Sequence, residues 1–263
     1  MRIALSQLAA EAEPARNLEL VKSAVAEAVD QDATVVVFPE ATMARFGIPL
    51  GPVAEPLDGA WANEVRSVAK RADVLIVVGM FTPAPDGRVT NTLLITGRGV
   101  DTHYDKIHLF DAFGFAESAT VAPGDHPVLC TVDGVTLGFA TCYDVRFPGL
   151  FQRLADDGAT ATLLSASWGA GPGKREQWEL LVRARALDST TWVLACGQAD
   201  PTTVGRQPSG KVPAGIGDSL AVSPLGEIRG QLGAEPDMLV VDINPAEVES
   251  ARKAVPVLAN RRL

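Results

Sequence analysis

The chain alternates between short apolar runs and longer stretches in which apolar residues recur every three or four positions. The short runs are rich in Val, Ile and Leu, and Gly, Pro or Asp often bounds them, a pattern typical of buried strands. They predict strands at residues 3–8, 34–38, 74–80, 89–95, 100–104, 128–132, 135–140, 161–165, 191–197, 219–222, 228–231 and 238–242. Asp133-Gly134, which separates two of these runs, indicates a tight hairpin.

The helical pattern is clearest after Pro14, where Leu18, Val21, Val25 and Val29 recur on one face of a helix. Proline suits the first turn of a helix, because the N–H that it lacks would have no partner there. Further helices are predicted at residues 60–71, 148–157, 175–188 and 245–254.

The order of these elements predicts the fold class. Strand–helix–strand units are mixed with hairpins, which favours two mixed sheets packed together, with helices on their outer faces. The 263 residues are 47% hydrophobic and 21% charged, which is ordinary globular composition and allows a large core. No linker, low-complexity tract or internal repeat divides the chain, so we predict one domain over residues 1–263. The tail at 255–263 contains apolar residues without periodicity, and we expect it to pack on a partner subunit.

The net charge limits the kinds of partner that the protein can bind, and the cysteine content indicates its cellular compartment. The net charge of −9 argues against nucleic acid and anionic membranes as partners, because both are bound by basic faces. Cys130, Cys142 and Cys196 indicate no disulfide framework, so a cytoplasmic location is expected. The N-terminus does not resemble a leader and no apolar run reaches about 18 residues, so we expect neither secretion nor a membrane span.

Three reactive side chains follow predicted strands. Glu40 comes after the strand at 34–38, Lys106 after 100–104, and Cys142 after 135–140. Open α/β sheets place their sites at the carboxyl ends of strands, and a thiol just before a helix is favoured as thiolate. Taken singly, each residue also has an ordinary explanation: a solvated loop acid, a surface lysine and a buried structural cysteine.

Together, these groups could perform nucleophilic catalysis at a carbonyl carbon. Glu40 could take the thiol proton as general base, after which the thiolate of Cys142 would form a covalent acyl-enzyme. Lys106 and the backbone N–H of Tyr143 could stabilise the developing oxyanion. Such a donor typically contributes about 3–4 kcal/mol.

Other types of site have weaker support. A Cys–His pair would use His103 or His108, although a structural role is commoner for such histidines. The glycine-rich stretch at 169–174 differs from a phosphate loop in its glycine spacing, and Arg175 stands where Ser or Thr would hold magnesium. No zinc spacing and no Gly-x-Gly-x-x-Gly after the first strand are present. We therefore predict no metal and no organic cofactor.

Three segments around the reactive residues resemble the signature segments of the nitrilase superfamily, also called carbon–nitrogen hydrolases. They are Phe38-Pro39-Glu40, the run from Tyr104 to Asp111 and the run from Cys142 to Pro148. The segments occur in the family's order, and the resemblance covers essentially the whole chain. It implies an α/β fold that forms a four-layer αββα sandwich, pairing into a homodimer or higher homo-oligomer through outer helices and C-terminal tails. It also implies a catalytic triad of Glu40, Lys106 and Cys142.

Within the superfamily, Leu109-Phe110-Asp111, Glu117-Ser118 and Pro123-Gly124 resemble the Nit branch, which includes omega-amidase and deaminated glutathione amidase. This resemblance implies that Glu117 is a second glutamate that helps to fix the lysine. It also implies a small primary amide as the substrate, cleaved to acid and ammonia through a cysteine thioester. The chain departs from the branch at Gly149, where relatives often carry glutamate, and in the loop at 167–170, which leaves the exact substrate open.

An omega-amide carries a carboxylate, so its pocket needs a cation. Candidates are Arg45, Arg146, Arg175 and Arg206. Arg146 is nearest to Cys142 in sequence, and a structural salt bridge is the alternative role for it. Tyr143 and Trp168 are candidate pocket walls, with plain core packing as the alternative for each. The alternative enzymes are a nitrilase and an N-carbamoyl amino acid hydrolase. A catalytically silent binding subunit on the same fold is the alternative of another class.

Overall fold

The first of two large sheets is centred on three parallel strands. The structure is a computed structural model that describes residues 1–208 and 212–262. The central strands are β1 (Arg2–Gln7), β2 (Val35–Val37) and β3 (Leu75–Pro83). Antiparallel strands flank them: β15 (Asp237–Asp242) on one edge, then β4 (Val89–Gly97) and β5 (Val100–Asp105) on the other. The short β8 (Val121–Ala122) pairs with β4 in parallel.

The second large sheet has a similar plan. Its parallel centre consists of β10 (Val135–Thr141), β11 (Ala161–Ala166) and β12 (Trp192–Gly197). Antiparallel neighbours are β9 (Leu129–Val132) beside β10, and β13 (Leu220–Val222) followed by β14 (Ile228–Gln231) beyond β12. Two further strands, β6 (Asp111–Ala112) and β7 (Phe115–Ala116), form a separate small hairpin.

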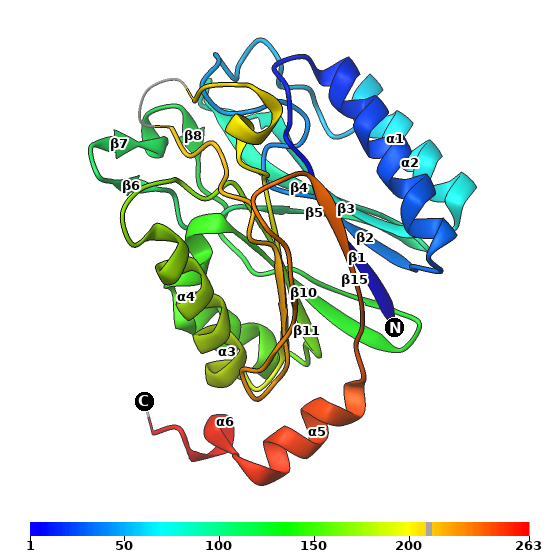
Figure 1. The fold of residues 1–263 in the computed structure, drawn as a ribbon, viewed down its shortest axis with the longest axis vertical. Helices are drawn as coiled ribbons and strands as arrows, with labels where there is room; N and C mark the ends of the chain where they lie inside the picture. The colour runs from blue at the N-terminus through cyan, green and yellow to red at the C-terminus, as the bar shows by residue number, and fades with distance from the viewer. Residues whose placement is uncertain (209–211, 263) are drawn as a thin grey trace.

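Paired helices cover the outer face of each large sheet (Figure 1). On the first sheet these are α1 (Pro14–Asp30) and α2 (Ala60–Ala72), which join its parallel strands. On the second sheet they are α3 (Pro148–Asp156) and α4 (Lys174–Ser189). The predicted four-layer αββα sandwich is therefore confirmed. The sequence predicted the start of α4 one residue too late. The helix begins at Lys174, directly after Gly173, whose φ of 69° lies in the left-handed region.

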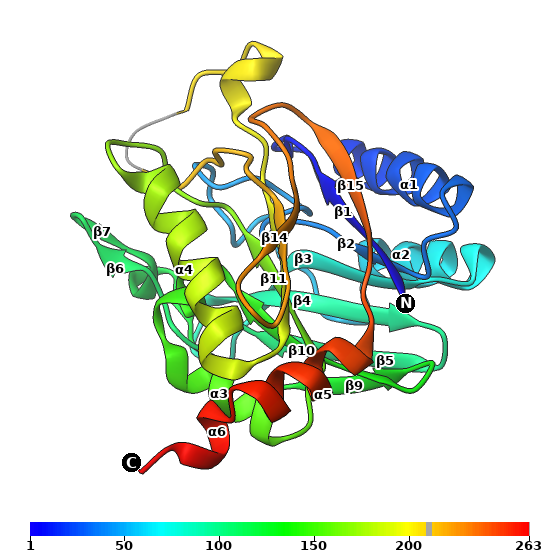
Figure 2. The ribbon, with the colours of Figure 1, turned by 60° about the horizontal axis from the view of Figure 1, so that its bottom comes forward.

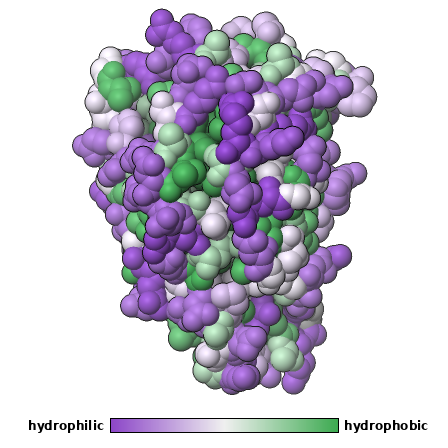
Figure 3. Space-filling view, turned by 90° about the vertical axis from the view of Figure 1, so that its right-hand side faces the viewer, coloured by the Kyte–Doolittle hydropathy of each residue, from purple (hydrophilic) through white to green (hydrophobic). Residues whose placement is uncertain are grey.

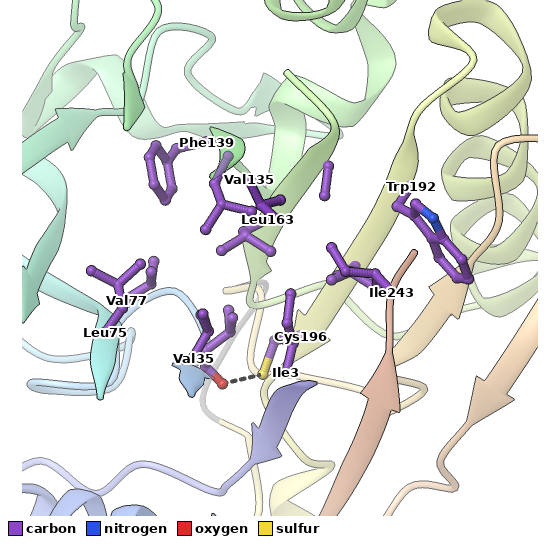
Figure 4. Packing of buried hydrophobic residues seen from close by; sticks show 14 of the residues in the cluster. Ile3, Val35, Leu75, Val77, Val135, Phe139, Leu163, Trp192, Cys196 and Ile243 are labelled. Atoms are coloured by element: carbon purple, nitrogen blue, oxygen red, sulfur yellow. Dashed lines mark hydrogen bonds between the residues drawn. The ribbon is translucent and has the colours of Figure 1, made fainter. Parts of the chain in front are cut away.

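The two sheets face each other across an apolar core. Figure 4 shows Val35 and Val77 from the first sheet opposite Phe139 and Leu163 from the second. Cys196 lies in this core, and its Sγ donates to the carbonyl oxygen of Val37 in the opposite sheet at 3.2 Å. The thiol is fully buried, and burial raises its pKa. The side chains that fill this layer hold the ends of the two sheets at a fixed separation.

The helix faces follow the apolar periodicity seen in the sequence. In α1, Val21, Val25 and Ala28 are buried against the first sheet, while the charged residues between them face outward. Figure 3, which looks onto this side of the molecule, shows a mostly hydrophilic surface with hydrophobic residues in small groups. Burial of one face by an amphipathic helix accounts for this division.

The chain ends in α5 (Pro245–Ala254) and α6 (Val257–Asn260), which run past one end of the sandwich (Figure 2). Arg261 reaches back to α3, where its Nη2 lies 2.7 Å from Asp156 Oδ2. Val255 stays about half exposed. Packing of this tail on a partner subunit stays a prediction. None of the helices in the described part of the chain combines the length and apolar character that a membrane span requires.

Candidate active site

Four side chains of the sequence prediction meet in one buried cluster. Glu40 follows β2 and Lys106 follows β5, both in the first sheet, whereas Cys142 follows β10 in the second. Glu117 opens the short 3-10 helix η1 (Glu117–Ala119). Each of the four is at most 6% exposed, so the groups interact in a medium that screens charge weakly.

Lys106 lies between the two carboxylates. Its Nζ donates to Glu40 Oε1 at 2.9 Å and to Glu117 Oε2 at 2.8 Å, with Glu117 Oε1 at 3.1 Å. The backbone N–H of Phe110 also donates to Glu117 Oε2, at 2.7 Å. Buried charges are stable only when they are paired and hydrogen-bonded, and this arrangement meets that condition with one net negative charge when all three are ionised.

Glu40 is held by three further contacts. The N–H of Ser167 donates to its Oε2 at 2.8 Å, and Asn91 Nδ2 donates to its Oε1 at 2.7 Å. Asn91 Nδ2 also reaches Glu117 Oε1, at 3.1 Å. The main chain is fixed as well, because Gln198 Nε2 donates to the carbonyl oxygen of Glu40 at 3.0 Å. The carboxylate therefore has one fixed direction, which a general base needs.

Cys142 sits at a sharp turn from strand to helix. Its φ is +46°, in the left-handed region that non-glycine residues rarely adopt and that is often found at functional sites. The short 3-10 helix η2 (Cys142–Arg146) starts here, and Thr141 and Asp144 form a reciprocal capping box around it. The thiol contacts the carbonyl oxygen of Ser167, with Sγ 3.6 Å from that oxygen.

Asp144 stabilises this turn through the hydrogen bonds of its side chain. Its buried carboxylate accepts from the N–H of Thr141 at 2.8 Å, from Tyr104 Oη at 2.7 Å and from the N–H of His108 at 3.0 Å. His108 Nδ1 lies 2.7 Å from the same carboxylate, and the imidazole stacks on Phe147. His108 thus has a structural partner, and His103 lies near Asp105. In the described structure, neither histidine bonds to the thiol.

The environment of the cluster shifts three pKa values. Burial raises the pKa of Glu40, and although Lys106 opposes this shift, the pKa stays above its ordinary value. Burial raises the pKa of the Cys142 thiol well above its usual range; Glu40 adds to this and Lys106 opposes it. Burial alone would lower the pKa of Lys106, but the charges of Glu40 and Glu117 outweigh it and raise the pKa. The lysine therefore stays charged, and Glu40 is a stronger base than an exposed glutamate.

A small cavity opens beside the thiol. Tyr143 and Trp168, the predicted walls, both line it, as do Lys106, Glu117, Cys142, Ser167, Lys174 and the aromatic residues Phe46, Phe110 and Phe115. Arg146 lies beside the cavity, with its guanidinium carbon 5.2 Å from the centre of the Trp168 ring.

The other candidate arginines have different surroundings. Arg175 pairs with Asp218 at 2.7 Å. Arg206 donates to the carbonyl oxygens of Ala9 and Ala10, and it lines a neighbouring cavity together with Arg45. Arg175 and Arg206 therefore have other partners, and Arg45 lines a different cavity from the thiol. In the described residues, no group of three or more His, Cys, Asp or Glu side chains is arranged to hold a metal ion.

Asn91 and Asp144 are site residues that sequence reasoning missed. Asn91 lies inside β4, in a run that the sequence shows only as a strand. A signal for Asp144 was present, because Thr141 and Asp144 have the Ser/Thr-x-x-Asp/Glu spacing of a capping box.

Asn91→Ala is expected to move the acid limb of the kcat/KM–pH profile to higher pH by about one unit. The hydrogen bond from Asn91 favours the ionised form of Glu40, so its loss raises the pKa of Glu40. Activity then falls more at pH 5–6 than at pH 8. Asn63→Ala, on the exposed face of α2, is the matched control and should leave the profile unchanged. An unmoved limb, or one at lower pH, would contradict this role.

A four-layer αββα sandwich with a thiol, a lysine and two carboxylates buried at its strand ends defines a carbon–nitrogen hydrolase. The family model described as Carbon-nitrogen hydrolase matches residues 2–253. This chain belongs to that family, the nitrilase superfamily, as its signature segments predicted.

Curated relatives agree with this assignment. The chain is 54% identical to Hydrolase Rv0480c of Mycobacterium tuberculosis, over 99% of this chain and 95% of that one. It is 32% identical to a deaminated glutathione amidase of Escherichia coli O157:H7, over 100% of this chain and 97% of that protein. Omega-amidase NIT2 of Mus musculus is 30% identical, over 99% and 95% of the two chains.

Solved structures show the same fold. Nit3 of Saccharomyces cerevisiae, described as a member of branch 10 of the nitrilase superfamily, superposes with a TM-score of 0.87 at 25% identity, over 100% of this chain and 97% of that one. A mutant amidase of Nesterenkonia sp. AN1 superposes with a TM-score of 0.81 at 25% identity, over 100% and 94% of the two chains. That structure carries the acetamide moiety of fluoroacetamide on its active-site cysteine.

Proposed function

We propose that this enzyme hydrolyses a small primary amide bearing a carboxylate, releasing the acid and ammonia through a thioester on Cys142. The observation that carries the proposal is the convergence of Cys142 with Glu40, Lys106 and Glu117 beside a cavity that Cys142 lines. The names of the relatives, deaminated glutathione amidase and omega-amidase, support an amide substrate of this kind.

The first half of the reaction forms the acyl-enzyme. Glu40 takes the thiol proton, and the Cys142 sulfur attacks the amide carbon, so that a C–S bond forms and the carbonyl oxygen becomes an oxyanion. The ammonium of Lys106 and the N–H of Tyr143 stabilise this oxyanion. Glu40 then gives its proton to the amide nitrogen, the C–N bond breaks, and ammonia leaves.

The second half restores the enzyme. Glu40 takes a proton from water as the water oxygen attacks the thioester carbon, and a second oxyanion forms at the same position. Collapse of this intermediate breaks the C–S bond and releases the acid, and the proton on Glu40 returns to the sulfur. Glu117 keeps Lys106 in place throughout, since its carboxylate accepts from Nζ through both oxygens.

The test is ammonia release from a panel of compounds: alpha-ketoglutaramate, succinamate, deaminated glutathione, butyramide, an aliphatic nitrile and an N-carbamoyl amino acid. We expect the highest kcat/KM for an amide that carries a carboxylate. A nitrile or a carbamoyl compound as the best substrate would replace the proposal with a nitrilase or a carbamoylase. Absence of turnover on the whole panel would favour a silent binding subunit.

A further inference from the structure

Lys174 is a cation at the thiol cavity, and residues 1–208 and 212–262 offer it no acidic partner. It is the first residue of α4, and it lines the same cavity as Cys142 and Lys106. Its Nζ lies 3.7 Å from the centre of the Phe113 ring. Between Nζ and the rest of the described chain, the structure shows no hydrogen bond and no ion pair. A lysine with its ammonium resting on an aromatic face stays available to a stronger ligand.

A second cation, Arg146, lies near the Trp168 ring, as Lys174 does. Trp168 lies near both charges, with Arg146 Cζ 5.2 Å and Lys174 Nζ 5.9 Å from its ring centre. The guanidinium of Arg146 donates to a neutral partner, Gln177 Oε1, at 2.8 Å. Trp168 Nε1 in turn donates to the carbonyl oxygen of Lys174 at 2.9 Å, which fixes the start of α4 against the wall.

The local electrostatic potential near Trp168 favours an anion. Acidic residues suit the first turn of a helix and basic ones do not, because the helix dipole makes that end positive. Burial and the charge of Arg146 lower the pKa of Lys174, so the two cations repel each other as the protein stands. A bound carboxylate would relieve this repulsion, whereas a neutral ligand would not.

We propose that Lys174 is the specificity-determining residue of this site: its ammonium binds the substrate carboxylate at the end opposite the scissile amide. Arg146, which also lies near Trp168, strengthens the positive potential. The inference rests on the proposed amidase function and deepens it. It states that the enzyme selects substrates by the negative charge at the end opposite the amide. Among the arginines considered from the sequence, Arg146 is the one near the Trp168 ring in the described structure, whereas Arg45, Arg175 and Arg206 lie elsewhere.

The test compares succinamate with butyramide, which has a methyl group in place of the carboxylate. We expect Lys174→Gln to lower kcat/KM for succinamate by about 10- to 100-fold and to change that for butyramide by less than about threefold. Lys174→Arg keeps the charge and should recover part of the preference. Lys70→Gln, at an exposed lysine of α2, is the matched control and should change neither value.

Each outcome decides something. Equal losses on both substrates would mean that Lys174 only holds the loop, and unchanged values would mean that another group reads the charge; either would overturn the inference. If the wild type releases no ammonia from any amide, the proposed function fails instead. Calorimetric binding of succinate then tests Lys174 by itself: the inference requires that Lys174→Gln weaken binding at least about tenfold relative to Lys70→Gln.

Discussion

Cys142→Ala is expected to abolish ammonia release, with a loss of at least about 10⁴-fold in kcat, while the protein stays folded. No other thiol can replace it: Cys196 is fully buried between the sheets, and Cys130 lies in the edge strand β9. Alanine keeps the small volume at this position, so the turn with positive φ should survive. We expect a change in Tm of no more than about 4 °C.

The measurement is ammonia release under single-turnover and steady-state conditions, together with a thermal melt of each variant. Cys130→Ala is the matched control, because it removes a partly buried thiol whose pKa burial raises to about 11. It should keep full activity. Activity in Cys142→Ala comparable to the wild type would remove the thioester from the mechanism, even if the enzyme still hydrolyses amides.

Glu40→Gln should give the second-largest loss, about 10³- to 10⁴-fold in kcat/KM. The amide cannot accept the thiol proton, and its NH2 group must face either the N–H of Ser167 or the ammonium of Lys106, both of which are donors. Because glutamine has the size of glutamate, the loss reports chemistry more than packing. The acid limb of the pH profile should also disappear, since the titrating base is gone.

Glu64→Gln is the control for this change. Glu64 lies on the surface of α2, where it pairs with Lys22 and Arg71, so its neutralisation should leave both rate and pH profile as they are. An acid limb that persists in Glu40→Gln would assign the base to another group. Glu117 would then be the first candidate, because it bonds to the same lysine.

Most of the fold could be predicted from the sequence, because the strands of both parallel centres are buried on two faces. Such strands appear as continuous runs of β-branched residues, as in 34–38, and their neighbours are amphipathic helices. The order of strands within each sheet could not be predicted in this way. Neither β15 beside β1 nor the pairing of β8 with β4 leaves a local signal, because both join segments far apart in the chain.

The site was predictable only in part, for a related reason. Glu40, Lys106 and Cys142 each follow a strand, so their residue types and positions were informative, and the family resemblance joined them. Asn91 looks like any polar residue in a strand until the two carboxylates lie beside it. Lys174 was not predicted as a site residue, because only arginines were candidate partners for a substrate carboxylate. Its position against Trp168 depends on the bend that Gly173 makes before α4.

The division of the cluster between two sheets constrains the rest of the molecule. Cys142 belongs to one half of the sandwich and Glu40 to the other. The contacts of Ser167 with Glu40 and of Ser165 with Phe38 join the two halves at this end. Phe139 and Leu163 belong to the core between the sheets and do not line the thiol cavity, so their bulk helps to set the separation of the two sheets. Substitutions in the layer between the sheets are therefore expected to be tolerated only in compensated pairs that preserve its thickness.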